Sequence, residues 1–290
     1  MSNTSIGDGD RSVVALKRSE MEIAGKVFVV TGAGSGIGRQ VAIGLIERGG
    51  IVAGADLNEA GLAETAALVA DPDRFSSHRL DVSDHEAVQR FPDEVSATHG
   101  QVDGLFNIAG IAQDFETVAE VTDERIEKLM RVNFWGTVWM TRAFLPLLEA
   151  RPDGAVIMNT SSLSALVPVP GAAIYGASKA AVALFGYGLA QDLRKRSKVT
   201  VTTAIPGTIW TELVRKSAVA LGTPEFVARS FAMKPEKAAR RMIETTRKGR
   251  MRVVVGKDAH FYGVTRRLST VVAERISYLQ VGTFVYRHKS

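Results

Sequence analysis

The chain has 290 residues, 46% of them hydrophobic, a formal net charge of +5 and no cysteine. This size and apolar content suit a single domain with a sizeable core. Without cysteine there are no disulfides or thiolate metal sites, and the five histidines show no ligand spacing, so no metal is expected. No apolar run reaches the ~18–20 residues of a membrane span, and the first residues lack a signal-peptide core, so we expect a soluble, cytoplasmic protein.

The positive charge is concentrated at one end of the chain. From Lys234 onward Lys and Arg outnumber Asp and Glu by 14 to 4, so the preceding part carries a net charge of −5. This excess is not interleaved with a recognisable nucleic-acid-binding module. No nucleic-acid partner is expected.

Residues 1–22 are polar and without periodicity, which predicts a mobile N-terminal arm ahead of the domain. The apolar run Lys26–Thr31 then predicts a strand buried on both faces, as parallel sheets require. Gly32, Gly36 and Gly38 follow it directly.

These glycines lead into the helical pattern Ile37–Arg48. Glycines at this point let the N–H groups of a helix N-terminus approach a pyrophosphate without obstruction by Cβ atoms. An ordinary tight loop is the alternative. The strand before the turn, the helix after it and an acid further along favour dinucleotide binding.

The acid is Asp56, which follows the apolar run Ile51–Ala55 and stands eighteen positions after Gly38. A carboxylate at this spacing can accept hydrogen bonds from the adenine-ribose hydroxyls, and it would repel a 2′-phosphate. Asp56 therefore predicts NAD as the cofactor. Two considerations oppose this: Asp56 could simply cap the helix that begins near Asn58, and the nearby Arg39 could relax the preference.

Strand and helix patterns alternate through the rest of the chain. This alternation predicts an α/β fold with a doubly wound, Rossmann-like parallel sheet in one domain spanning residues 23–258. The further strands are expected at Phe75–Leu80, Val102–Asn107, Ala155–Thr160, Val199–Ala204 and Arg252–Val255, and the long helices at Thr122–Leu148, Ala172–Arg196 and Pro235–Arg247.

A hydroxyl, a phenol and an ammonium group come together around the fifth strand and the helix after it. Tyr175 and Lys179 are four apart, so they share one helix face, and Ser162 follows the strand. A tyrosine titrates near pH 10, so work as a base at neutral pH needs an adjacent cation, which Lys179 is placed to provide. Ser162 can polarise the oxygen that Tyr175 protonates or deprotonates. A solvated surface pair is the alternative for Tyr175 and Lys179.

The companion motifs decide between these alternatives, because together they resemble the short-chain dehydrogenase/reductase family over roughly residues 25–256. The motifs, in the family order, are T-G-A-G-S-G-I-G at Thr31–Gly38, N-I-A-G at Asn107–Gly110, Asn133, Ser162 thirteen positions before Y-G-A-S-K, and P-G at Pro206–Gly207. The resemblance implies NAD(P)-dependent oxidoreduction.

The resemblance also implies residue roles. Tyr175 is the acid/base, Lys179 tunes it, Ser162 rather than Ser161 or Ser164 holds the substrate oxygen, and Asn133 bends its helix and completes a water relay. Ile108 departs from the family pattern of two asparagines, and Asp81 could be an ordinary turn acid. The residues implied to bind the cofactor are Gly32, Ser35, Gly36, Ile37, Gly38, Asp56, Asp81, Val82, Asn107, Ala109, Gly110, Tyr175, Lys179, Pro206, Gly207, Ile209 and Thr211.

We therefore predict an NAD-dependent enzyme that interconverts an apolar secondary alcohol and its ketone. The alternatives are an NADP-dependent carbonyl or oxoacyl reductase, and a non-catalytic dinucleotide-sensing or scaffold protein. The family pairs its long helices across subunits, so a homodimer or homotetramer is expected.

Two segments lie outside this motif set. Residues 212–233 break periodicity and predict a lid over the substrate, next to apolar residues that could line a pocket or belong to the core. Residues 259–290 predict an extension containing one amphipathic basic helix. Packing of its apolar stripe on this subunit or a partner is favoured over contact with a membrane surface. The stripe consists of Phe261, Val264, Leu268, Val271 or Val272, Ile276 and Leu279.

Overall fold

A computed structural model describes residues 20–69, 71–220, 224–282 and 285. Seven parallel strands form one sheet in the order β3-β2-β1-β4-β5-β6-β7. The strands are β1 (Val27–Thr31), β2 (Ile51–Asp56), β3 (Phe75–Arg79), β4 (Gly104–Asn107), β5 (Val156–Thr160), β6 (Thr200–Pro206) and β7 (Arg252–Val255). The predicted doubly wound sheet is confirmed, and its strand order reverses between β1 and β4, where Val30 pairs with Phe106.

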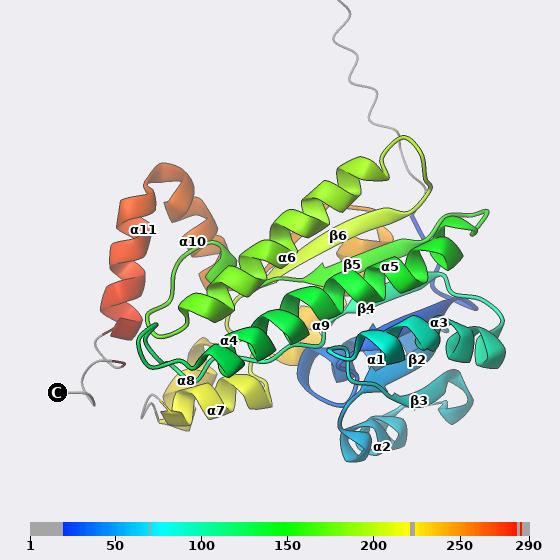
Figure 1. Cartoon of the computed structure of the whole chain (residues 1–290), viewed down its shortest axis with the longest axis horizontal. Coiled ribbons are helices and arrows are strands. Elements are labelled where there is room, and N and C mark those ends of the chain that lie inside the picture. The colour runs from blue at the N-terminus through cyan, green and yellow to red at the C-terminus, as the bar shows by residue number, and fades with distance from the viewer. Residues whose placement is uncertain (1–19, 70, 221–223, 283–284, 286–290) are drawn as a thin grey trace, which may run out of the picture.

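Helices cover both faces of the sheet (Figure 1), and each face has its own apolar core. One face packs against α1 (Gly36–Ile46), α2 (Glu59–Leu68) and α9 (Pro235–Arg247). The other packs against α3 (His85–His99), α5 (Gly136–Glu149) and α6 (Ala173–Asp192). Every residue of β1 is buried because both its faces are covered, as its unbroken apolar run predicts.

The predicted helix over residues 122–148 is not continuous. α4 (Asp123–Met130) passes into a π-helical turn at Arg131–Trp135 before α5 begins. Asn133 lies in this turn and is fully buried. A π turn fits one additional residue into a helix, and it often occurs at functional sites.

The predicted lid is helical, with α7 (Glu212–Ala220) and α8 (Glu225–Phe231). Of the apolar residues expected near it, Val167 and Ile209 belong to the core, whereas Leu213 and Phe226 are exposed. Among the described helices, none has the length and apolarity to cross a bilayer.

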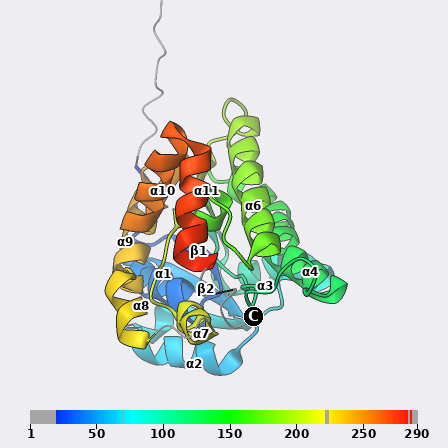
Figure 2. The same ribbon diagram turned by 90° about the vertical axis from the view of Figure 1, so that its left-hand side faces the viewer.

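The single amphipathic helix predicted for the tail is wrong. The tail folds as α10 (Lys257–Leu268), α11 (Thr270–Ser277) and a π turn at Tyr278–Gly282, and α10 and α11 lie side by side (Figure 2). Ser269 separates them in an extended conformation and caps α11 by accepting the Val272 N–H.

The helical phase is therefore reset at Ser269, and the predicted apolar stripe does not form one buried face. Leu268 is 83% exposed, and the buried contacts to Val167 are made by Tyr262 and Ala273. The expected packing of the stripe on this subunit or a partner is met within this subunit only by Ile276, which is partly buried. Leu268 and Val272 are exposed, so for them packing on a partner subunit stays a prediction.

The predicted boundary at residues 258/259 falls inside α10, and the one at residues 22/23 falls in an irregular segment that is attached to the domain. α10 begins before residue 259, so one helix joins the domain and its extension. At the other end, Glu20 forms an ion pair with Arg247, and the Met21 N–H bonds to the Arg247 carbonyl. Residues 20–22 are thus attached to the end of α9, and residues 1–19 of the predicted arm lie outside the described residues.

Candidate active site

Tyr175 and Lys179 lie on the first two turns of α6, on the same face. The Lys179 ammonium nitrogen is 6.0 Å from the centroid of the Tyr175 ring. It donates a hydrogen bond to the carbonyl of Thr160, the last residue of β5, at 3.1 Å. No ion pair involves Lys179 among the residues that the structure describes, so a buried cation stands beside the phenol.

Burial determines the titration of both groups. It raises the pKa of the Tyr175 phenol above its ordinary value, and a hydrogen bond with the Ser162 side chain only partly opposes this. Burial lowers the pKa of the Lys179 ammonium group to about 8. The predicted lowering of the Tyr175 pKa by Lys179 is therefore wrong for the chain by itself, because desolvation of the phenolate dominates.

Three serines compete for the place beside Tyr175, and their hydrogen bonds separate them. The Ser161 hydroxyl donates to the Lys179 carbonyl at 2.7 Å, so it is committed to the backbone of α6. Ser162 shares a hydrogen bond with the Tyr175 phenol. The Ser162 oxygen also accepts the Ser164 N–H at 3.2 Å, which fixes the start of the following turn. Ser162 is thus the serine that meets the phenol.

Asn133 is brought to the same place by the π turn. Its amide oxygen accepts the Ile111 N–H at 2.8 Å, and its amide nitrogen donates to the Ile111 carbonyl and to the Ser178 hydroxyl. Ser178 in turn donates to the Tyr175 carbonyl at 2.7 Å. Asn133 therefore links the segment after β4 to the helix that carries Tyr175, through a residue that the sequence patterns do not single out.

Gln113 is a second residue that sequence reasoning missed. It is 3% exposed, and its side-chain oxygen accepts the N–H groups of Ile174 and Tyr175 at 3.1 and 3.2 Å. Ala172 at the N-cap of α6 has no side-chain acceptor, so Gln113 caps the helix from about sixty residues away. It positions the backbone of Tyr175.

We expect Gln113→Ala to lower turnover about 10- to 100-fold, because a small displacement of Tyr175 misaligns the proton transfer. Two buried N–H groups would also lose their acceptor, which lowers the melting temperature. Steady-state kinetics and thermal melts of the variant would test this. Gln113→Glu keeps the acceptor oxygen but loses the hydrogen bond that the amide nitrogen donates to the Glu116 carbonyl, so it should restore part of the turnover. Gln89→Ala, at an exposed position of α3, should change nothing. Equal turnover in Gln113→Ala and wild type would contradict the positioning role.

The glycine-rich turn after β1 leaves the start of α1 open to a ligand. Gly36 has a φ of +51°, a conformation that favours glycine. A Cβ atom on Gly38 would collide with the Gly32 carbonyl, and one on Gly36 would lie 3.2 Å from Thr211. Ser35 is the N-cap and its side chain makes no capping hydrogen bond within the described structure. The first N–H groups of α1, including that of Ile37, can therefore receive an anion.

Asp56 lies at the end of β2 beside this turn. Its two carboxylate oxygens accept the N–H groups of Gly34 and Asn58, each at 2.9 Å. The cap of α2 is Asn58, which accepts the Gly61 N–H, so capping does not account for Asp56. Arg39 is engaged elsewhere: it donates to the carbonyls of Gly34 and Gly61 and to the side chains of Glu64 and Thr65.

The remaining predicted residues after β3 and at the end of β4 lie at the carboxyl ends of the strands, and their side chains have different partners. One Asp81 oxygen accepts from the backbone and hydroxyl of Ser83, and Val82 is buried beneath Gly136. The Asn107 side chain donates inward, to Thr141 and Asn159.

The N-I-A-G segment is held by a residue outside the predicted set. The Thr31 hydroxyl accepts the N–H groups of Ile108 and Ala109. A Cβ atom on Gly110 would lie 3.0 Å from both the Asn133 oxygen and the Lys179 nitrogen. The absence of a side chain at Gly110 keeps this space free.

The segment after β6 is fixed by the start of α10. The Gly207 N–H bonds to the Val255 carbonyl, and the Thr208 N–H bonds to the Asp258 carboxylate at 2.6 Å. Ile209 is buried and pairs with Met233. Thr211 lies next to Gly36, so the segment after β6 adjoins the glycine-rich turn after β1.

The comparisons with known proteins agree with this arrangement. Residues 26–220 match the model of the short chain dehydrogenase family. The chain belongs to the short-chain dehydrogenase family. It is an oxidoreductase whose fold binds a nicotinamide dinucleotide.

Individual members of the family extend the likeness beyond the matched region. SadH of Mycobacterium tuberculosis, named as an oxidoreductase, is 40% identical over 268 residues, which cover 90% of this chain and 96% of SadH. The 3beta-hydroxysteroid dehydrogenase 2 of Eggerthella lenta is 37% identical over 161 residues, covering 55% of this chain and 62% of that protein. A short-chain dehydrogenase from Burkholderia phymatum, solved in complex with NAD, superposes with a TM-score of 0.74 at 27% identity and covers 86% of this chain and 94% of its own.

Proposed function

We propose that this short-chain dehydrogenase interconverts an apolar secondary alcohol and its ketone with NAD(H), and that Tyr175 is its acid and base. The observation that carries the proposal is that Ser162, Tyr175 and Lys179 lie together where the carboxyl end of β5 meets the first turns of α6. Asn133 is linked to this group through Ser178. Such a grouping supplies a proton donor, a cation and an oxygen-binding hydroxyl within one crevice.

In the oxidative direction Tyr175 removes the proton of the substrate hydroxyl while Ser162 holds the same oxygen. The bound nicotinamide supplies the acceptor for the hydride that leaves the carbinol carbon. In the reductive direction Tyr175 returns its proton to the ketone oxygen. Lys179 holds the nicotinamide ribose, and Asn133 maintains the water path that exchanges protons with solvent.

Lys179 supports this role electrostatically. With a pKa of about 8 it is an ammonium ion at neutral pH, although it is buried. A buried cation about 6 Å from the ring favours the phenolate each time the proton leaves Tyr175. Burial alone disfavours the negative charge of the Tyr175 phenolate, and the Lys179 ammonium group offsets this when Tyr175 has given up its proton.

The dinucleotide would lie along the edge that carries the predicted residues. The N–H groups of Ser35, Gly36 and Ile37 would meet the pyrophosphate, and Asp81 and Val82 the adenine. The segment Pro206–Thr211 would hold the carboxamide. Asn107, Ala109 and Gly110 would support the crevice through their backbone.

NAD is favoured over NADP by the charges around Asp56. A 2′-phosphate at this place would meet the carboxylate, and the Arg39 guanidinium is already bound to Glu64 and two carbonyls. The Burkholderia phymatum relative binds NAD, which supports the same choice. An NADP-dependent reductase remains the second candidate because Arg39 is the cation nearest to the turn.

We expect Asp56→Ala to weaken NAD binding and to narrow or reverse the preference over NADP. The variant loses an acceptor for the ribose hydroxyls and the repulsion of a 2′-phosphate. Titrations of both dinucleotides would give the ratio of the NADP and NAD dissociation constants for the wild type and for the variant. Glu59→Ala, which removes a nearby exposed acid, should leave the ratio unchanged. Tighter binding of NADP by the wild type would refute NAD as the cofactor.

The substrate is expected to be apolar because its surroundings are. Leu213 on α7 and Phe226 on α8 expose apolar side chains in the predicted lid, and α7 directly follows the segment after β6. The hydroxysteroid dehydrogenase of Eggerthella lenta is named for a secondary alcohol on an apolar skeleton. Alicyclic secondary alcohols are therefore the first class to try.

The proposed reaction can be tested directly by following NADH absorbance with a panel of secondary alcohols of increasing apolar size. Turnover that rises with apolar size would support the proposal. NADPH formation alone would favour the carbonyl or oxoacyl reductase, and tight NAD binding without turnover on any alcohol or ketone would favour a dinucleotide-sensing protein.

A homodimer or homotetramer is proposed from the outer faces of the π turn at Arg131–Trp135 and of α6. Trp135 in the π turn is 45% exposed and Leu184 on α6 is 74% exposed, and the two elements pack together through Phe134 and Phe185. Large apolar side chains on adjacent helices favour contact with another subunit. We propose a cytoplasmic location for this assembly.

A further inference from the structure

A cavity of about 450 Å³ lies between β7 and α10, away from the candidate active site. Part of its wall is apolar and comes from distant parts of the chain, with Leu166, Ile205, Val254 and Val264 among the lining residues. Ile205 and Val254 are paired neighbours on β6 and β7, so they form a continuous floor. None of Ser162, Tyr175 and Lys179 lines this space.

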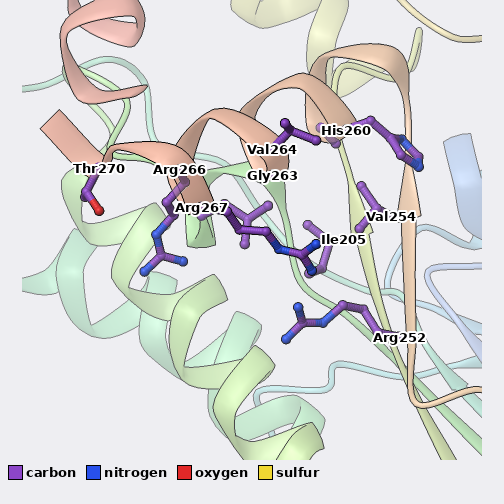
Figure 3. Close-up of a pocket in the computed structure, with 11 residues that line it drawn as sticks. Ile205, Arg252, Val254, His260, Gly263, Val264, Arg266, Arg267 and Thr270 are labelled. Carbon is purple, nitrogen blue, oxygen red and sulfur yellow. The ribbon is translucent and has the colours of Figure 1, made fainter. Parts of the chain in front are cut away.

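Three arginines border the cavity. Figure 3 shows the guanidinium groups of Arg252 and Arg267 pointing into the same space, whereas the Arg266 guanidinium lies apart from them, on the side of Thr270. Arg252 stacks on the ring of Tyr187 at 4.5 Å, which fixes its side chain. Within the described part of the chain, none of these arginines forms an ion pair with a carboxylate. The charges of Arg252 and Arg267 therefore converge with no carboxylate from the described residues to balance them.

His260 also borders the cavity but does not add to this charge. Its Nδ1 lies 2.6 Å from the Gly256 carbonyl, so it carries the proton and donates it there. Its Nε2 faces the guanidinium of Arg241 at 3.4 Å, which requires an acceptor. In Figure 3 the ring is turned away from the arginines. The counter-charge for a ligand is thus provided by arginine alone.

We propose that this cavity binds an anionic amphiphile: a phosphate or carboxylate head group held by Arg252 and Arg267, with Arg266 adding positive charge at the rim and an apolar chain against the β6–β7 floor. Guanidinium groups bind these anions through paired, charge-assisted hydrogen bonds. Val264 and Leu268 are one turn apart on α10, and both are exposed, so the apolar wall continues outward from the cavity.

Another copy of this chain is a poorer occupant. In a symmetric contact the same patch meets itself, so the positive charge of one copy would face an equal positive charge on the other. A membrane lipid offers the same head-group and chain chemistry. We favour a monomeric amphiphile because Arg252 and the apolar floor lie on the sheet beneath α10, whereas a bilayer would meet the protruding helix face first.

The test is isothermal titration calorimetry of the full chain with dodecyl phosphate kept below its micelle concentration. We expect saturable binding with one ligand per chain, at least about 10-fold weaker in Arg252→Gln/Arg266→Gln/Arg267→Gln because two or more charge-assisted contacts are lost. The matched control Arg90→Gln/Lys128→Gln/Lys195→Gln removes the same net charge elsewhere and should bind like the wild type.

Two further measurements separate the head group from the chain. Neutral dodecyl maltoside should not bind, and inorganic phosphate should bind at least about 10-fold more weakly than dodecyl phosphate. Val264→Ser should weaken dodecyl phosphate about fivefold and leave inorganic phosphate unchanged. Together these results would support one site for both parts of the ligand.

Several outcomes would overturn the proposal. They are no binding of dodecyl phosphate, equal weakening in both triple variants, and equal affinity for phosphate and dodecyl phosphate. Sedimentation with phosphatidylglycerol vesicles without binding of monomeric dodecyl phosphate would likewise overturn it, and would assign the arginines to a bilayer surface.

Discussion

Tyr175→Phe is expected to lower the turnover number by at least about 100-fold in both directions, with NAD affinity nearly unchanged. The variant removes only the phenolic oxygen, and general acid–base assistance contributes at least this factor. The ring stays in place on the first turn of α6, so the crevice keeps its shape. Single-turnover kinetics and dinucleotide titration on the same samples would measure the two effects separately.

Tyr187→Phe is the matched control, because it removes a phenolic oxygen from the same helix at a residue that faces Arg252 instead of the crevice. It should keep the wild-type turnover number. Turnover of Tyr175→Phe within a few-fold of wild type would rule out Tyr175 as the acid and base, and it would direct attention to Ser162 as the proton-transferring group.

Lys179→Met is expected to have the second large effect, again about 100-fold on turnover. It removes the buried ammonium group that favours the phenolate and the contact proposed for the nicotinamide ribose. Dinucleotide affinity should therefore fall as well, which distinguishes this variant from Tyr175→Phe. Turnover and affinity both equal to wild type would exclude Lys179 from the site.

The pH dependence of ketone reduction gives a second test of the role of the Lys179 charge. The pKa of Lys179 is about 8, so its charge is present at neutral pH and is half lost by pH 8. The wild-type kcat/KM for reduction should be level up to about pH 7 and fall as pH rises through 8. Lys179→Arg keeps its charge throughout this range and should not show the decline, although its absolute rate will be lower. A decline that persists in Lys179→Arg would belong to another group.

The free energy of unfolding should rise with pH over the range in which kcat/KM for reduction falls. The pKa of Lys179 is lower in the folded chain than its usual 10.5, so the unfolded chain binds more protons between pH 8 and 10.5. Its contribution to the free energy of unfolding therefore rises with pH across this window, by about 3 kcal/mol in total. Lys179→Met should melt at a higher temperature than wild type at pH 7 and lose this part of the pH dependence.

Much of the fold follows from patterns within short stretches of sequence. β7 and α9 have the predicted bounds, and the inner strands differ from prediction by one or two residues at their ends. Strands buried on both faces give continuous apolar runs, and helices between them give a 3.6-residue period, so both can be recognised locally. The same local period placed Tyr175 and Lys179 together.

The features that were missed depend on contacts between distant residues. Gln113 caps a helix that begins sixty residues later, and no pattern around it indicates that partner. The two-helix tail depends on whether Ser269 caps a new helix or continues the old one, which packing decides. The titration of Tyr175 depends on how completely its phenol is buried, and spacing along a helix carries no information about desolvation.

The π-helical turn at Arg131–Trp135 makes the length of this stretch as important as its composition. Successive residues of an α-helix are separated by roughly 100° of rotation, so deleting one residue here would restore a continuous helix and rotate α4 relative to α5 by about that angle. Asn133 would then turn away from Ile111 and Ser178. The contacts of the Asn133 amide with Ile111 and α6 therefore depend on the number of residues in this turn as well as on the asparagine itself.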